Sequence, residues 1–152
     1  MVAAGLGPAR LGNQGRAQVW DRVAALRNLR PEASPNLGIF RTGPWPGATL
    51  SLRLLERHAR STQLFVPLRA ARTLFVVAPP DAFDGGALDP GAVRAFVAGP
   101  DQGVTYHPGT WHHPLVALDA PGEHLCLVWE AGTAEDCEIR EVGGVEVEWG
   151  EG

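Results

Sequence analysis

The sequence predicts an all-β fold, and three observations lead to that prediction. The chain has 152 residues, of which 45% are apolar, which is enough for one domain with a buried core. Its 19 glycines and 13 prolines punctuate many short apolar runs, a pattern that favours short strands joined by turns over a helical bundle. About nine such runs and one short helix predict a closed or sandwiched β architecture.

The strands are expected in the following order. Residues 1–15 are rich in glycine and are predicted to form a flexible leader before a single domain over residues 16–152. Residues 18–29 fit a helix or a strand, with the strand favoured. Clear strand patterns follow at 37–41, 48–58, 62–67, 73–78, 104–106, 114–118, 125–129, 139–142 and 145–149. The run at 73–78 is apolar throughout, which is typical of a central strand.

One helix is predicted, at about residues 90–98. Asp89 is a suitable N-cap and Pro90 would occupy the first helical position. The expected apolar stripe consists of Val93, Phe96 and Val97, and Gly99 would end the helix.

Composition excludes several classes of function. All 13 basic residues are arginines, so Schiff-base, pyridoxal phosphate and P-loop lysine chemistry are excluded. A net charge of −4 gives no basic face for nucleic acid. The start of the chain does not resemble a signal peptide, and no apolar stretch approaches a membrane span, so we expect a cytoplasmic protein that binds neither nucleic acid nor membrane. The two cysteines, Cys126 and Cys137, fit a reducing compartment and are expected to be small buried side chains.

A histidine cluster is the most distinctive feature of the sequence. Three of the five histidines lie within residues 107–113. The sequence His107-Pro-Gly-Thr110 predicts a type II turn, after which the chain continues as an extended strand. In an extended strand His112 and His113 point to opposite faces, so only one of them can face the interior of a barrel.

A second set of polar residues follows the Leu54-Leu55 doublet, where the register of the 48–58 strand is expected to shift. Glu56 and His58 then share one face of the strand, as paired metal ligands or an acid/base pair would. The pattern Glu56-x-His58-x₄-Gln63, together with Gly109-x-x-His112, has the spacing of the two cupin metal motifs.

Further segments of the chain, together with these motifs, resemble one protein family. The segments are Leu55-Glu-Arg-His58, Ser61-Thr-Gln63-x-Phe65-x-Pro67-Leu68, Phe75-Val-Val-Ala78, Arg94-Ala-Phe96, Gln102-Gly-Val-x-Tyr-His107 and Gly109-x-Trp111-His-His-Pro-Leu115, with a looser match at Asp136-Cys137. Together they resemble the ureidoglycolate lyase family of purine and allantoin catabolism. The resemblance implies a cupin-like double-stranded β-helix or β-barrel, a homodimer, and a carbon–nitrogen lyase of the amidine-lyase type that splits ureidoglycolate into glyoxylate and urea. Nickel is the cofactor of some members.

Roles for individual residues follow as hypotheses. His58, His112, Glu56 and Gln63 form an N/O donor set suited to nickel, manganese or iron. His107 or His113 would carry a proton, and Glu56 is a further candidate for acid/base work. Candidate substrate-binding residues are Arg41, Tyr106 and Trp111. A guanidinium such as that of Arg41 matches a carboxylate, although a surface role for Arg41 and a core role for Trp111 are the plainer interpretations.

Two other functions stay open at the level of sequence. Family members carry an Asp-Arg pair followed by two glycines near the C-terminus, and here that place has Trp129-Glu130-Ala131-Gly132. This difference motivates a cupin-like module that binds a small carboxylic acid without turning it over. Another metal-dependent cupin enzyme acting on a 2-hydroxy acid would share the same residues.

Overall fold

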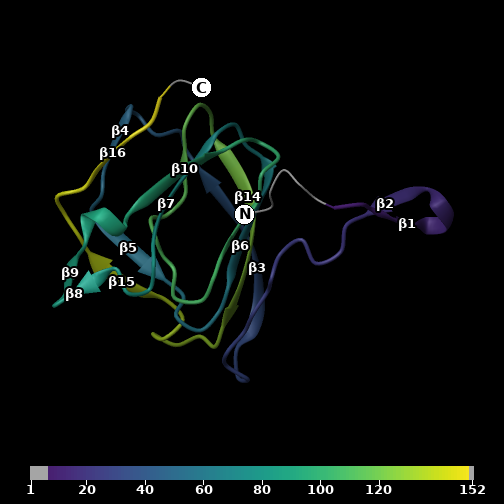
Figure 1. Ribbon diagram of the computed structural model, residues 1–152, viewed down its shortest axis with the longest axis horizontal. Helices are drawn as coiled ribbons and strands as arrows, with labels where there is room; N and C mark the ends of the chain where they lie inside the picture. Colours follow the sequence, from purple (N-terminus) through teal and green to yellow (C-terminus); the bar gives the residue numbers. More distant parts are fainter. Residues whose placement is uncertain (1–6, 151–152) are drawn as a thin grey trace.

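Two facing antiparallel sheets form the body of the protein, as a computed structural model that describes residues 7–150 shows (Figure 1). The first sheet has the order β10-β7-β12-β5-β15, with β13 also paired to β7. Its strands are β5 Leu54–Arg57, β7 Thr73–Ala78, β10 Arg94–Ala98, β12 Trp111–His112, β13 Val116–Ala117 and β15 Glu138–Glu141. The second sheet has the order β11-β6-β14-β3, from β3 Ser34–Thr42, β6 Gln63–Arg69, β11 Val104–Tyr106 and β14 Gly122–Glu130. The predicted all-β fold is confirmed.

Smaller two-stranded units complete the fold. They pair β4 Thr49–Ser51 with β16 Glu146–Glu148, β8 Phe83–Asp84 with β9 Ala87–Leu88, and β1 Arg10–Gly12 with β2 Ala17–Val19. A short 3₁₀ turn, η1 Asn13–Gly15, joins β1 to β2, and this hairpin extends away from the barrel (Figure 1). The predicted leader therefore contains a strand within residues 7–15, while residues 1–6 lie outside the described residues.

The central strands of the first sheet are buried on both faces, as β7 shows. Phe75 and Val77 face the space between the two sheets, where they meet Phe65, Tyr106 and Cys126. The alternating residues of β7 enter a second core on the outer side, under the β4–β16 and β8–β9 pairs; this outer core includes Leu50, Leu52, Leu55, Leu74, Val76, Ala78 and Trp111. A strand that is apolar on both faces is the pattern of a central strand. The prediction for residues 73–78 is confirmed in position and in burial.

The predicted helix at about 90–98 is wrong. Asp89 does cap the segment, accepting a hydrogen bond from the Gly91 backbone N–H at 2.8 Å, but only one 3₁₀ turn forms, η2 Pro90–Ala92. Arg94–Ala98 is strand β10, which pairs with β7 along its whole length. The free edge of β7 supplies backbone partners that the local pattern could not reveal, and Val and Phe are well suited to a strand.

Two other expectations need smaller corrections. In the ambiguous segment 18–29, the strand ends with β2 at Val19, and the rest is irregular apart from an isolated bridge between Asn28 and Ser61. The strand predicted over 48–58 is divided, because β4 ends at Ser51 and β5 begins at Leu54. The register break thus precedes the leucine doublet, and Leu55 joins Leu50 and Leu52 in the outer core.

Candidate active site

Strand pairing places a carboxylate and two imidazoles at one end of the space between the sheets. Strand β12 pairs with β5 so that His112 lies opposite Glu56. The His112 Nε2 atom lies 3.3 Å from Glu56 Oε1. The ring of His58, two residues along from Glu56 on the same face, stacks beside that of His112 with 5.8 Å between ring centroids.

The turn before β12 has the predicted form. Thr110 N–H donates to the His107 carbonyl at 3.1 Å, and Gly109 has φ of +81°, the geometry of a type II turn with glycine at its third position. The Gly109 N–H also donates to the backbone carbonyl of His58 at 2.9 Å. The turn is therefore tied to the strand that carries Glu56 and His58.

His112 is buried and held on several sides. Its ring stacks on Tyr106 with a centroid separation of 4.2 Å, and its Nδ1 donates to the Thr110 carbonyl at 3.0 Å. A carbonyl can only accept, so Nδ1 carries a hydrogen. The opposite nitrogen, Nε2, faces the Glu56 carboxylate. His112 and Glu56 thus lie close enough for a proton to pass between them.

His58 is held in the same tautomer. Its Nδ1 donates to the backbone carbonyl of Asp136 at 2.7 Å, which leaves the lone pair on Nε2. Burial lowers the pKa of His58, against the Asp136 hydrogen bond, which raises it. A neutral imidazole with a free Nε2 lone pair can accept a proton.

Opposing effects act on Glu56. Burial raises the pKa of its carboxyl group, but the contact with His112 and the charges of His112, His58 and His113 outweigh burial and bring the pKa below its usual value. The thiol of Cys137 lies 4.0 Å from Glu56 Oε2, and burial raises the pKa of that thiol to about 11. Glu56 is therefore favoured as a carboxylate.

Unpartnered polar atoms gather at this end of the barrel. Among the buried side-chain atoms of the described residues that lack a hydrogen-bond partner, Tyr106 Oη and Gln63 Oε1 lie near His112 and Glu56. Tyr106 and Gln63 are direct neighbours on β11 and β6, and Tyr106 stacks on His112. Buried polar groups are nearly always hydrogen-bonded, so these two atoms are candidates for contact with a small polar molecule.

The other predicted site residues lie elsewhere. Arg41 is 80% exposed and forms an ion pair with Glu123. On β14, Glu123 lies five positions from Val128, which pairs with Gln63, a separation of about 17 Å at the rise of a strand. The structure therefore does not bring Arg41 to Gln63.

The remaining candidates, Trp111, His113 and His107, also lie apart from the His112–Glu56 pair. Trp111 is buried in the outer core. His113 is half-buried and its Nδ1 donates to the Pro114 carbonyl at 2.8 Å, while burial lowers its pKa. His107 is exposed on the turn and lines a cavity of about 500 Å³ between the edges of β10 and β11. That cavity is mainly apolar and is lined by Tyr106, whose ring stacks on His112.

The predicted metal ligands can be tested against the structure by their donor atoms. His58 and His112 both donate Nδ1–H to backbone carbonyls, the arrangement that exposes Nε2 to a metal ion. Gln63 Oε1 is unpartnered and Glu56 supplies a carboxylate. The donor types therefore fit a divalent ion. As the side chains lie, however, no three His, Cys, Asp or Glu groups among residues 7–150 are close enough to hold one.

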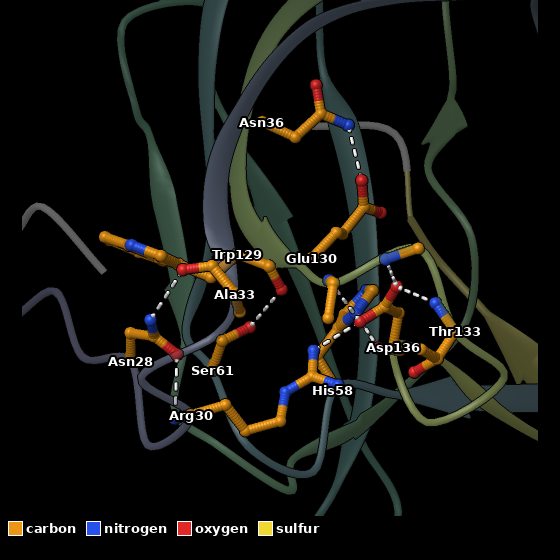
Figure 2. A network of polar contacts seen from close by, with 12 residues as sticks. Asn28, Arg30, Ala33, Asn36, His58, Ser61, Trp129, Glu130, Thr133 and Asp136 are labelled. Atoms are coloured by element: carbon orange, nitrogen blue, oxygen red, sulfur yellow. Dashed lines mark hydrogen bonds and ion pairs between the residues drawn. The ribbon is translucent and has the colours of Figure 1, made fainter.

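Sequence reasoning missed a buried ion pair next to His58, between Arg30 and Asp136 (Figure 2). The Asp136 carboxylate also accepts hydrogen bonds from the backbone N–H groups of Ala131, Gly132 and Thr133 at 2.7 to 2.9 Å. The only sequence signal was the loose family match at Asp136-Cys137. Its partner lies 106 residues away in the chain, a distance that local patterns do not bridge.

Two facing antiparallel sheets with imidazole, carboxylate and amide groups buried at one end define an all-β protein with a polar candidate site. The chain belongs to the ureidoglycolate lyase family, whose family model matches residues 2–148. The match includes the glycine-rich start of the chain.

Individual relatives agree with this assignment. Proteins named ureidoglycolate lyase from Azotobacter vinelandii, Pseudomonas fluorescens and Pseudomonas syringae are 38%, 36% and 34% identical to this chain. Each match covers 83% of this chain and 71 to 72% of the relative. Among solved structures, RmlC from Streptococcus suis and a dTDP-6-deoxy-D-glucose-3,5-epimerase RmlC from Legionella pneumophila are 11% and 12% identical, each with a TM-score of 0.43. These matches cover 68% and 67% of this chain and about half of each RmlC chain, 46% and 51%. In the described residues, no helix has the length and apolar character needed to cross a membrane.

Proposed function

We propose that this protein cleaves ureidoglycolate into glyoxylate and urea. The observation that carries the proposal is the Glu56–His112 pair, together with the unpartnered Tyr106 and Gln63 atoms, in a chain of this family. The relatives named ureidoglycolate lyase support the choice of substrate.

The reaction needs two proton transfers and no other reactant. Ureidoglycolate is a carbinolamide, with a hydroxyl and a urea nitrogen on the same carbon. The hydroxyl loses its proton as its oxygen forms the carbonyl of glyoxylate, the C–N bond breaks, and the departing urea nitrogen takes up a proton. An enzyme that places a base and an acid on either side of that carbon accelerates both steps.

Different side chains supply the base and the acid. His58, with a free Nε2 lone pair, accepts the hydroxyl proton. The proton shared by His112 and Glu56 passes to the urea nitrogen. Each turnover thus moves one proton onto His58 and takes one from the His112–Glu56 pair, and exchange with water restores the starting state. Catalytic roles for His107 and His113 are not part of this scheme, because neither contacts Glu56.

Tyr106 and Gln63 provide the polar contacts for the substrate. Tyr106 Oη can donate to a substrate oxygen, and Gln63 Oε1 can accept from a urea N–H. Burial raises the pKa of Tyr106, so its hydroxyl keeps its proton at neutral pH. The two groups orient the urea end of the substrate.

As an alternative to these acid and base roles, we propose that a divalent metal ion, nickel in the first instance, assists the reaction, because it would use the same Nε2 and carboxylate atoms. His58, His112, Glu56 and Gln63 would hold it if their side chains came closer together than they lie here. When bound, the ion would lower the pKa of the substrate hydroxyl and neutralise the substrate carboxylate.

The assembly and location are proposals of the same kind. Exposed apolar side chains on β3 and β10 favour a homodimer; they are Leu37, Ile39, Phe40, Phe96 and Val97. A monomer mass by light scattering at micromolar concentration would contradict the dimer. Two free cysteines, Cys126 and Cys137, support a cytoplasmic location.

The activity is tested by incubating the protein with racemic ureidoglycolate and measuring glyoxylate and urea, with and without nickel or manganese. We expect product formation well above the spontaneous breakdown, and its loss in His112→Ala. Equal rates with and without protein would overturn the proposal. A thermal shift with glyoxylate but no product would instead support a binding module.

A further inference from the structure

The orientation of His58 is fixed by a hydrogen bond to a backbone carbonyl, that of Asp136. The His58 Nδ1–H···O bond to this carbonyl, at 2.7 Å, is the contact that leaves the Nε2 lone pair free. Asp136 lies in the loop between β14 and β15, and such loops move more than the strands that they join. Something must therefore hold this loop in place if His58 is to keep one tautomer.

The side chain of Asp136 fixes its own loop. Its carboxylate accepts three backbone hydrogen bonds, from Ala131 at 2.9 Å, Gly132 at 2.7 Å and Thr133 at 2.9 Å. The Asp136 N–H in turn donates to the Thr133 carbonyl at 3.1 Å. These hydrogen bonds close a compact turn, and they hold the pKa of the Asp136 carboxyl well below its usual range. The carbonyl that faces His58 belongs to Asp136, the residue whose side chain holds this turn together.

A buried arginine from the other end of the chain anchors the turn to the barrel. The Arg30 guanidinium is 5% exposed and pairs with the Asp136 carboxylate. The segment around Arg30 is itself fixed to the residues that follow His58: Leu29 N–H donates to the Arg60 carbonyl at 2.8 Å, and Thr62 N–H donates to the Arg27 carbonyl at 2.9 Å. Asn28 Oδ1 accepts from the Arg30 N–H at 3.0 Å (Figure 2).

We propose that Arg30 and Asp136 are positioning residues of the active site, which hold the Asp136 carbonyl against His58 Nδ1 and thereby fix the orientation of the His58 ring and the tautomer that leaves Nε2 facing the site. Neither residue touches the substrate. Their effect passes through His58, as a backbone carbonyl or carboxylate sets the reactive nitrogen of histidines in other sites. The catalytic consequence rests on the proposed function, whereas the tautomer does not.

Four variants separate this role from a general structural one. Arg30→Met removes the charge that anchors the turn, and Arg30→Lys restores a cation. Asp136→Asn keeps the size of the side chain but places an NH₂ group among backbone N–H donors. The matched control is Glu138→Gln, which also removes a carboxylate paired with an arginine, Arg57, two residues further along the chain. Arg57 adjoins His58 in sequence, but its guanidinium lies over Trp111, on the outer side of the sheet.

Two measurements are made on each folded variant. Proton–nitrogen NMR of ¹⁵N-histidine-labelled protein reports which nitrogen of His58 carries the hydrogen, with the signal assigned by His58→Gln. Ureidoglycolate kinetics report kcat and KM separately. We expect the Nδ1–H tautomer of His58 in the wild type and in Glu138→Gln. In Arg30→Met and Asp136→Asn we expect a mixture of tautomers and a kcat lower by about tenfold or more, with KM changed by less than about twofold and recovery in Arg30→Lys.

The outcomes that contradict the proposal are specific. An unchanged His58 tautomer in folded Arg30→Met and Asp136→Asn would overturn it, even if kcat fell. A mixed tautomer with wild-type kcat would overturn the catalytic role. If the wild type does not cleave ureidoglycolate, the proposed function fails, and the NMR signal still decides whether Arg30 and Asp136 set the tautomer.

Discussion

Trp111 and His112 are consecutive residues of β12, and their side chains enter two different cores. Trp111 packs against Phe83 in the outer core, with the Arg57 guanidinium 4.4 Å from its ring centroid. His112 points to the other side of the sheet, where it meets Glu56 and Tyr106. The two residues of β12 therefore face the outer core and the candidate site, respectively. A register shift of one residue would exchange the environments of these two side chains.

The first prediction contrasts His112 with its other neighbour. His112→Ala removes the partner of Glu56, so we expect loss of turnover and of any bound nickel measured in the purified protein. His113→Ala should keep both, because His113 bonds to the Pro114 carbonyl and does not contact Glu56. Turnover rates and metal analysis of the two purified variants check this. Retention of metal and activity in His112→Ala, with their loss in His113→Ala, would show that the register of β12 is wrong by one residue.

A second prediction concerns the tyrosine hydroxyl. Tyr106→Phe keeps the ring that stacks on His112 and removes an unpartnered buried Oη. Since burying such a group without a partner costs free energy, the free energy of unfolding should rise by about 1 kcal/mol. KM for ureidoglycolate should rise several-fold, because the hydroxyl is a substrate contact in our proposal. Urea unfolding and steady-state kinetics measure the two effects, and an unchanged KM would remove Tyr106 from the binding site.

The turn before β12 supports a third prediction. Gly109 has φ of +81°, and a Cβ there would lie 3.4 Å from the Pro80 ring. Gly109→Ala should therefore lower the free energy of unfolding by about 1–2 kcal/mol and reduce kcat, since the turn bonds to the His58 carbonyl. Gly143→Ala is the control, because Gly143 has no positive φ and open space around its Cβ position. Equal thermal midpoints for both variants would contradict the strain argument.

The fourth prediction is a pH dependence of stability. The three backbone hydrogen bonds and Arg30 hold the pKa of Asp136 below its usual value of 3.8. A carboxyl whose pKa is lower in the folded than in the unfolded state adds stability above the unfolded pKa, and loses it as pH falls toward the folded pKa. The difference in unfolding free energy between wild type and Asp136→Asn should therefore be largest at neutral pH and shrink below about pH 4. Urea unfolding at several pH values measures it, and a difference that grows on acidification would contradict the argument.

Sequence patterns predicted the parts of the fold that depend on residues close together in the chain. The alternation of apolar and polar residues located most strands, and the Pro-Gly pair located the turn at His107–Thr110. The same alternation separated His112 from His113. These features depend on residues that are close in sequence.

Features that depend on distant partners were missed. Arg94–Ala98 fits a short helix by its cap and its apolar spacing, but it becomes a strand because β7 offers a free edge. Arg41 looked suitable for a carboxylate, yet a cross-strand neighbour, Glu123, pairs with it at the surface. The Arg30–Asp136 pair joins two irregular segments that carry no periodic signal at all.

The distance in sequence between Arg30 and Asp136 also orders events during synthesis of the chain. His58 and the strand that carries it emerge from the ribosome well before residue 136, and until then the hydrogen bond that fixes the His58 ring has no acceptor. Contacts between segments so far apart carry a large entropic cost of loop closure and form late in folding. The orientation of the imidazole is thus a product of the completed chain, and a nascent protein acquires it only when its two halves have met.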